Sequence, residues 1–185
     1  TKESYIELLR ALYNVYHAME LGLREMPDHL KHVDFSALER ADALAADLRY
    51  YLGTPEGEPV DLGQPSAAAQ QYVERVQLLA REDPLLLLAH AYTRYLGDLS
   101  GGQILARSAA KAYGLPANTG ASFYKFERIG NSAAELKAYK KAYRSSLDSL
   151  QLSARRADDM VQEASSAFLM NISLFEERDV AAGHL

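Results

Sequence analysis

Residues 90–103 read HAYTRYLGDLSGGQ, and this stretch decides the fold of the chain. Apolar residues recur at helical spacing on both sides of it, so the pattern predicts that one helix runs through it. The stretch nevertheless contains Gly97, Gly101 and Gly102. A glycine inside a helix costs about 1 kcal/mol relative to alanine, so the three together cost about 3 kcal/mol. A cost of this size indicates that the glycines serve a purpose other than helix stability.

Gly97 and Gly101 are four residues apart and therefore share one face of the predicted helix. A face without side chains lets the backbone approach a flat object closely, and it leaves the helix free to bend. A neighbouring helix that crosses at the glycines would explain them equally well. Arg94 and Asp98 have the same spacing and could form a pair. Charges beside a bare face in an apolar segment favour a polar site within a pocket.

Outward from this stretch, the apolar spacing predicts helices along almost the whole chain. A first helix begins at Thr1 or Ser4 and ends by Pro27, and others are expected at about residues 36–51, 66–81, 84–113, 132–150 and 153–178. Gly and Pro mark residues 53–65 as a loop, and residues 118–131 form a second loop with aromatic side chains. Strand alternation and internal repeats are absent. The sequence predicts a single all-α domain that covers residues 1–185.

The composition excludes several classes of protein. The chain has 185 residues, of which 48% are apolar, so it can bury a core and is not of the disordered class. It has no cysteine, which excludes disulfides and thiolate metal sites and suits a cytoplasmic location. The net charge of −5 argues against a nucleic-acid partner. No apolar run is long enough to cross a bilayer, and the start of the chain has no signal peptide.

The quoted stretch resembles the signature of the heme oxygenases, and other segments agree with that family in order and spacing. These segments are LYNVY at 12–16, QYV at 71–73 with EDP at 82–84, YKKAYR at 139–144, and AFLMNI at 167–172 with FEE at 175–177. The resemblance covers essentially the whole chain. It implies an all-helical, heme oxygenase-like fold that clamps heme between a proximal helix and a glycine-kinked distal helix.

The resemblance also implies an activity, a cofactor and partners. Heme oxygenases cleave heme at a meso carbon to biliverdin, carbon monoxide and ferrous iron, so heme is both substrate and cofactor. They consume molecular oxygen and electrons, which an NADPH-dependent reductase or a ferredoxin supplies. We expect the same activity here, in a monomer.

The family pattern assigns catalytic roles on the distal side of the heme. Gly97 and Gly101 would lie against the heme face, in agreement with the bare helix face inferred above. Asp98 would organise ordered water there, because heme carries the oxygen activation and the protein supplies orientation and proton delivery. Arg94, Tyr16 and Asn171 would belong to the same hydrogen-bond network.

Other residues would bind the heme itself. Lys140 and Arg144 would meet the heme propionates through charge-assisted contacts, although their spacing alone favours a solvated helix face. Tyr72 would be a further propionate contact.

Four residues complete the expected heme contacts. Tyr92 and Thr93 belong to the signature and would also contact heme. Phe168 and Phe175 would line the pocket, although aromatic residues at this spacing are more often ordinary core.

One family feature has no counterpart in this sequence. The histidine that binds the heme iron lies on a helix that would precede this chain, roughly twenty residues before Thr1, which is room for a short helix and turn. The histidines present do not match its position, so no metal ligand is assigned; they are His17, His29, His32, His90 and His184. We therefore expect an N-terminally incomplete heme oxygenase domain, with weak heme binding and poor turnover.

Two alternatives to a heme oxygenase stay open. The chain could be a non-catalytic heme-binding relative, such as a sensor or carrier. It could also be a helical interaction module without a small ligand, although that reading must explain the interior glycines beside Arg94 and Asp98. Some family members are anchored by an apolar C-terminal tail and others are soluble. The chain ends at Leu185 without such a tail, so anchoring stays open.

Overall fold

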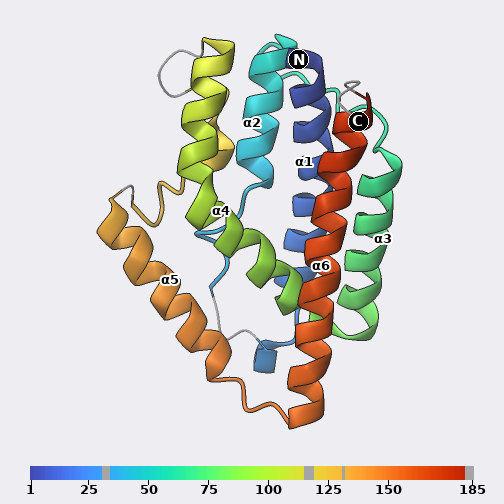
Figure 1. Cartoon of the computed structure of the whole chain (residues 1–185), viewed down its shortest axis with the longest axis vertical. Helices are drawn as coiled ribbons and strands as arrows, with labels where there is room; N and C mark the ends of the chain where they lie inside the picture. The colour runs from blue at the N-terminus through green and yellow to red at the C-terminus, as the bar shows by residue number, and fades with distance from the viewer. Residues whose placement is uncertain (31–33, 115–118, 131, 182–185) are drawn as a thin grey trace.

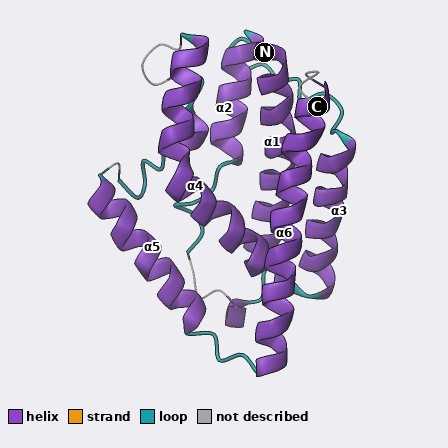
Figure 2. Cartoon of the chain, viewed as in Figure 1, coloured by secondary structure: helices purple, strands orange, loops and turns teal. Residues whose placement is uncertain are grey.

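The computed structural model describes residues 1–30, 34–114, 119–130 and 132–181, and all regular structure within them is helical (Figure 2). The α-helices are α1 (Lys2–Arg24), α2 (Ala41–Leu52), α3 (Ala67–Glu82), α4 (Pro84–Tyr113), α5 (Ala133–Asp148) and α6 (Ala154–Ala181). Two single-turn 3₁₀ helices are η1 (Asp28–Leu30) and η2 (Ser122–Tyr124). The predicted all-α fold is confirmed.

The first helix, α1, lies at the centre of the bundle, where it packs against α2, α3, α4 and α6 (Figure 1). Thr1 caps it, since the Thr1 side chain accepts a hydrogen bond from the Ser4 amide at 3.1 Å. Residues of its apolar face, including Leu9, Val15 and Tyr16, are fully buried. The central position of α1 brings its side chains within reach of every other long helix except α5.

The helix predicted over residues 36–51 begins later, at Ala41, so its predicted start was wrong. The amides of Arg40 and Ala41 both donate to the buried carboxylate of Glu20 on α1. A carboxylate at a helix N-terminus satisfies the amides that lack partners within the helix and interacts favourably with the helix dipole. The start of α2 is therefore set by a side chain twenty residues away, which local spacing does not reveal.

The helix α4 continues through the glycine-rich stretch, as predicted, and its axis changes direction near its middle (Figure 1). Pro84 occupies its first turn, and Gly114, with a φ of 59°, ends it in the left-handed conformation. The three glycines lie in the middle of α4, where the missing side chains permit a bend. The prediction of a glycine-kinked helix agrees with this shape.

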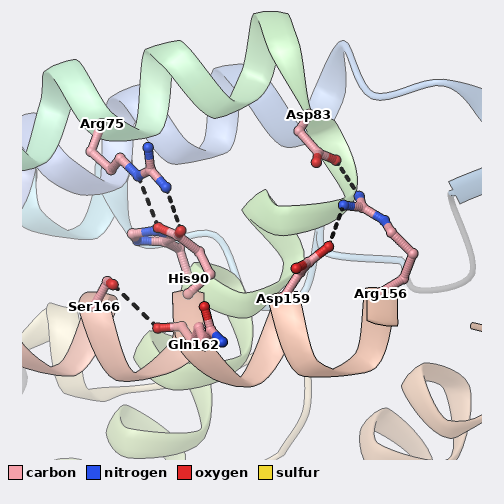
Figure 3. Close-up of polar contacts among 8 residues, drawn as sticks. Arg75, Asp83, His90, Arg156, Asp159, Gln162 and Ser166 are labelled. Carbon is pink, nitrogen blue, oxygen red and sulfur yellow. Dashed lines mark hydrogen bonds and ion pairs between the residues drawn. The ribbon is translucent and has the colours of Figure 1, made fainter. Parts of the chain in front are cut away.

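Polar contacts fix α6 against α3 and α4 (Figure 3). The buried carboxylate of Glu163 on α6 accepts a hydrogen bond from Nε of Arg75 on α3 at 3.0 Å, and its Oε1 lies 2.8 Å from Nε2 of His90 on α4. Arg156 near the start of α6 donates to Asp83, between α3 and α4, at 2.6 Å. Burial disfavours the charge on Glu163, but the hydrogen bonds from His90 and Arg75 lower its pKa to about 2.

The part of the chain that the structure describes contains no helix with the length and apolar character needed to cross a membrane.

Candidate functional site

A pocket of about 400 Å³ opens between α1, α4, α6 and the η2 segment. Most of its lining is apolar and a few polar side chains contribute to it, as is typical of small-molecule sites. The lining residues are Tyr5, Leu8, Leu12, Thr93, Arg94, Gly97, Asp98, Gly102, Leu105, Ser108, Phe123, Tyr124, Asn171 and Phe175.

The glycines of α4 leave bare backbone beside this pocket. A Cβ atom placed on Gly97 or on Gly101 would meet no other atom within 4 Å, so both positions face open space. By contrast, a Cβ on Gly22 of α1 would lie 2.8 Å from the Leu87 side chain. Close packing against a neighbouring helix therefore explains the glycine at position 22. It does not explain Gly97 or Gly101. The bare face expected from the sequence is present.

The four side chains predicted to act with the glycines form one continuous hydrogen-bond chain across three helices. The hydroxyl of Tyr16 on α1 donates to Oδ2 of Asp98 on α4. Nε of Arg94 donates to the Tyr16 hydroxyl at 3.1 Å, and its Nη1 donates to Oδ1 of Asn171 on α6. The Arg94 guanidinium also lies 4.7 Å from the centre of the Tyr16 ring. Arg94 and Asp98 are thus bridged by Tyr16 rather than paired directly.

The charges in this network stabilise one another. Burial raises the pKa of Asp98, and the nearby Arg94, the Tyr16 hydrogen bond and Arg40 all oppose that rise. Burial would lower the pKa of Arg94, but Tyr16 and Asp98 raise it above its ordinary value. Burial raises the pKa of Tyr16 well above its ordinary value. Tyr16 is therefore a neutral hydroxyl that can donate to Asp98.

Some of the predicted heme contacts lie at or near this pocket. Thr93 and Phe175 line it. Nζ of Lys140 on α5 lies 3.5 Å from the hydroxyl of Ser100, next to the glycine stretch of α4. Arg144, one turn further along α5, is exposed to solvent.

Four other predicted contacts lie outside the described lining, and Gly101 of the bare face is one of them. Tyr72 is fully buried in the core, where its ring centre is 5.3 Å from that of His90. Tyr92 is partly exposed, with its ring centre 6.3 Å from that of Tyr143 on α5. Phe168 on α6 is 58% exposed. Helical spacing places these residues near the site, but it does not decide which way each side chain points.

Sequence reasoning missed part of the pocket wall. Tyr5, Leu8 and Leu12 on α1 follow the same spacing as the core residues of that helix, and nothing in the spacing separates pocket from core. Phe123 and Tyr124 belong to the loop with aromatic side chains that the sequence predicts at residues 118–131. The Tyr5 hydroxyl donates to the Tyr124 hydroxyl at 3.3 Å and so joins these two parts of the wall.

The histidines were expected to have no role as metal ligands. His90 has its Nε2 at hydrogen-bond distance from Glu163, and His17 is exposed, with its ring stacked 5.5 Å from that of Tyr13. His32, His184 and the side chain of His29 lie outside the described residues. Among the described residues, no group of three or more acidic or histidine side chains could hold a metal ion.

Comparison with known proteins identifies the family. Residues 1–177 match the family model described as heme oxygenase. The chain belongs to the heme oxygenase family. It is 39% identical over 180 residues to the heme oxygenase of Guillardia theta, a match that covers 96% of this chain and 73% of that protein. It is 43% identical to heme oxygenase 1 of Synechocystis over 178 residues, which cover 95% of this chain and 71% of that one.

Solved heme oxygenase structures share the fold. Heme oxygenase-2 from Synechocystis, crystallised in complex with heme and NO, matches with a TM-score of 0.91 and 36% identity, over 98% of this chain and 73% of that chain. Heme oxygenase-1 from the same organism, in complex with heme, matches with a TM-score of 0.87 and 41% identity, over 99% of this chain and 82% of that one. The expected heme oxygenase-like fold is confirmed.

Proposed function

We propose that this chain is a heme oxygenase that binds heme between α1, α4 and α6 and cleaves it at a meso carbon. The products are biliverdin, carbon monoxide and ferrous iron, and the reaction consumes molecular oxygen and electrons. The observation that carries this proposal is the bare face of α4 at Gly97 and Gly101, which opens beside the Asp98 network. Membership of the heme oxygenase family supports it independently.

The pocket fits heme in shape and chemistry. A flat macrocycle needs a wall without side chains, and α4 offers one because a Cβ at Gly97 would meet open space. A largely apolar ring needs apolar walls, which Leu8, Leu12 and Phe175 supply. The heme propionates need cations, and we assign them to Lys140 and Arg144 on α5.

Heme supplies the iron that activates oxygen and also the carbon skeleton that is oxidised. The protein residues orient water and hold protons. We assign Oδ1 of Asp98 to ordered water, since Oδ2 already accepts the proton of the Tyr16 hydroxyl. Arg94 holds that hydroxyl from the other side, and Asn171 holds Arg94. Asp98 is thereby fixed in one orientation before the reaction begins.

We further propose that residues 1–185 act as one domain and as a monomer, with electrons from an NADPH-dependent reductase or a ferredoxin. The cytoplasmic location expected from the sequence stays a prediction.

Heme titration tests the function. The chain is mixed with heme, with and without imidazole, and ascorbate and oxygen are then added. No histidine is among the residues that line the described pocket, so imidazole supplies a nitrogen ligand for the heme iron. We expect a Soret band of bound heme, followed by the absorbance of biliverdin when imidazole is present. Bound heme without biliverdin would favour the non-catalytic relative, and the absence of heme uptake under all conditions would overturn the proposal.

A further inference from the structure

The backbone of the η2 segment, which forms part of the pocket wall, is held by two charged side chains from outside the segment. Asp47 on α2 is fully buried, and both of its carboxylate oxygens accept backbone hydrogen bonds from this segment. Oδ1 accepts from the amide of Ser122 and Oδ2 from the amide of Phe123, each at 2.8 Å. Hydrogen bonds to an ionised acceptor are stronger than neutral ones, so these two contacts fix the start of η2.

A second charged residue, Arg40, binds two carbonyl groups in and directly after the η2 segment. The side chain of Arg40, at the N-terminus of α2, donates from Nη1 to the carbonyl oxygen of Phe123 at 3.4 Å and to that of Lys125. Its guanidinium also lies 4.2 Å from the centre of the Phe126 ring. A carboxylate thus holds the amides of the segment, and a guanidinium holds its carbonyls.

The side chains of this segment face the site. Phe123 and Tyr124 both line the pocket. The Phe123 ring packs edge-on against the ring of Tyr16, with the ring centres 5.5 Å apart and an interplanar angle of 72°. The same Tyr16 donates its hydroxyl proton to Asp98. A contiguous path of contacts therefore runs from Asp47, through Phe123 and Tyr16, to Asp98.

We propose that Asp47 and Arg40 are positioning residues for heme cleavage, because they fix Phe123 against Tyr16 and so direct the Tyr16 hydroxyl toward Asp98. This role rests on the proposed function. Neither residue lines the pocket. Asp47 therefore acts through Phe123. Arg40 acts through Phe123 and also favours the charge of Asp98 electrostatically. Because Asp47 and Arg40 bind backbone groups, the side chains of Phe123 and Tyr124 remain available to form the pocket wall.

The first test measures the positions of Phe123 and Tyr16 without any heme cleavage. In Asp47→Asn, one amide of η2 faces a side-chain NH₂ instead of an acceptor, because asparagine offers a single oxygen. We expect hydrogen exchange at the Phe123 amide to accelerate about tenfold or more. We also expect the ¹³C resonances of the Tyr16 ring, assigned through Tyr16→Phe, to shift. Asp42→Asn is the matched control, since Asp42 is exposed on the same helix and should leave both measurements unchanged.

The second test measures heme cleavage by the same variants. We expect Asp47→Asn to lower kcat about tenfold with KM for heme within about twofold, which is the pattern of a lost transition-state interaction. We expect Tyr16→Phe to lower kcat less in the Asp47→Asn background than in the wild-type chain, because the hydroxyl is already misdirected there. If Asp47→Asn does not fold, Arg40→Lys is measured in the same way, since lysine keeps the charge but loses the planar group.

The two arms separate the two proposals. Tyr16 resonances that stay unchanged in a folded Asp47→Asn or Arg40→Lys variant would overturn the positioning role, whatever the turnover. Additive effects of Asp47→Asn and Tyr16→Phe on kcat would also overturn it. Wild-type protein that binds heme without producing biliverdin would overturn the proposed function, while the resonance measurement would still decide whether Asp47 positions Tyr16.

Discussion

The hydroxyl of Tyr16 on α1 donates its proton to Oδ2 of Asp98 on α4, across 82 positions of the chain. This contact fixes the only carboxylate among the residues that line the described pocket. Arg94 donates to the same hydroxyl, so Tyr16 both accepts from a cation and donates to an anion. Such a chain of hydrogen bonds is strengthened by mutual polarisation, and it holds Asp98 beside the bare face of α4.

Replacing Asp98 by alanine should reduce biliverdin formation about a hundredfold, because a positioned acid–base group typically contributes a factor of this size. Peroxidase-like oxidation products should increase. The measurement is the rate of biliverdin appearance together with the yield of oxidised guaiacol. Asp158→Ala, at an exposed position of α6, is the control for the loss of a carboxylate. Undiminished biliverdin from the Asp98→Ala variant would refute the role given to Asp98.

Tyr16→Phe removes a single hydroxyl that joins Asp98 to Arg94. Both partners lose a hydrogen bond in a buried site, and bonds to charged groups contribute about 1.5–3 kcal/mol. We therefore expect the free energy of unfolding at neutral pH to fall by about 2 kcal/mol, as measured by urea titration. Tyr50→Phe, at a half-exposed position, should change it little. Equal stability of the two variants would show that the Tyr16 hydroxyl is not held by the network.

Gly97→Ala should stabilise the protein and weaken heme binding. Alanine stabilises a helix interior by about 1 kcal/mol relative to glycine, and the added Cβ would meet open space. We expect Tm of the heme-free chain to rise by about 2–4 °C, while heme affinity falls about tenfold because the methyl group occupies the heme side. Gly22→Ala is the contrasting variant, since its Cβ would lie 2.8 Å from Leu87 and should lower Tm. Unchanged heme affinity in Gly97→Ala would contradict the proposed heme position.

Glu163→Gln should remove part of the acid sensitivity of the fold. Although burial disfavours its charge, His90 and Arg75 lower the pKa of Glu163 to about 2 from its ordinary 4.5. A lowered pKa stabilises the folded state above pH 4.5, and this contribution, at most about 3 kcal/mol, is lost as the pH falls from 4.5 toward 2. The difference in unfolding free energy between the wild type and Glu163→Gln should therefore shrink over that range. A difference in unfolding free energy that stays constant with pH would contradict the lowered pKa of Glu163. Glu176→Gln, at an exposed position of α6, is the control.

Replacing Glu20 by glutamine should remove a contribution to the unfolding free energy that depends on pH in the opposite direction to that of Glu163. Burial raises the pKa of Glu20 to about 7, although the hydrogen bonds from the amides of Arg40 and Ala41 favour its charged form. A raised pKa means that the stabilisation is complete below pH 4.5 and is lost as the pH rises from 4.5 through 7. The unfolding free energy of the wild type should therefore fall across this range by about 3 kcal/mol more than that of Glu20→Gln. Parallel stability curves for the two proteins between pH 5 and 8 would contradict the raised pKa.

The positions of most helices could be predicted from the sequence because their signals are local. Thr1 and Ser66 cap helices through their own side chains, Pro84 begins α4, and Gly114 ends it. The start of α2 at Ala41 could not be predicted, because the carboxylate that sets it comes from Glu20 on another helix. A cap supplied by a distant residue leaves no trace in the local spacing.

The sequence by itself determined the helical class, the bare face at Gly97 and Gly101, and the family, since glycine spacing and a long motif are properties of the chain alone. Only the tertiary structure decided how the predicted network is connected, with Tyr16 between Asp98 and Arg94 and with Asn171 on the far side of Arg94. Each long side chain has several rotamers, and the packing of α1, α4 and α6 selects one. The same packing decided that Tyr72 is turned into the core, although helical spacing alone allowed it to face the pocket.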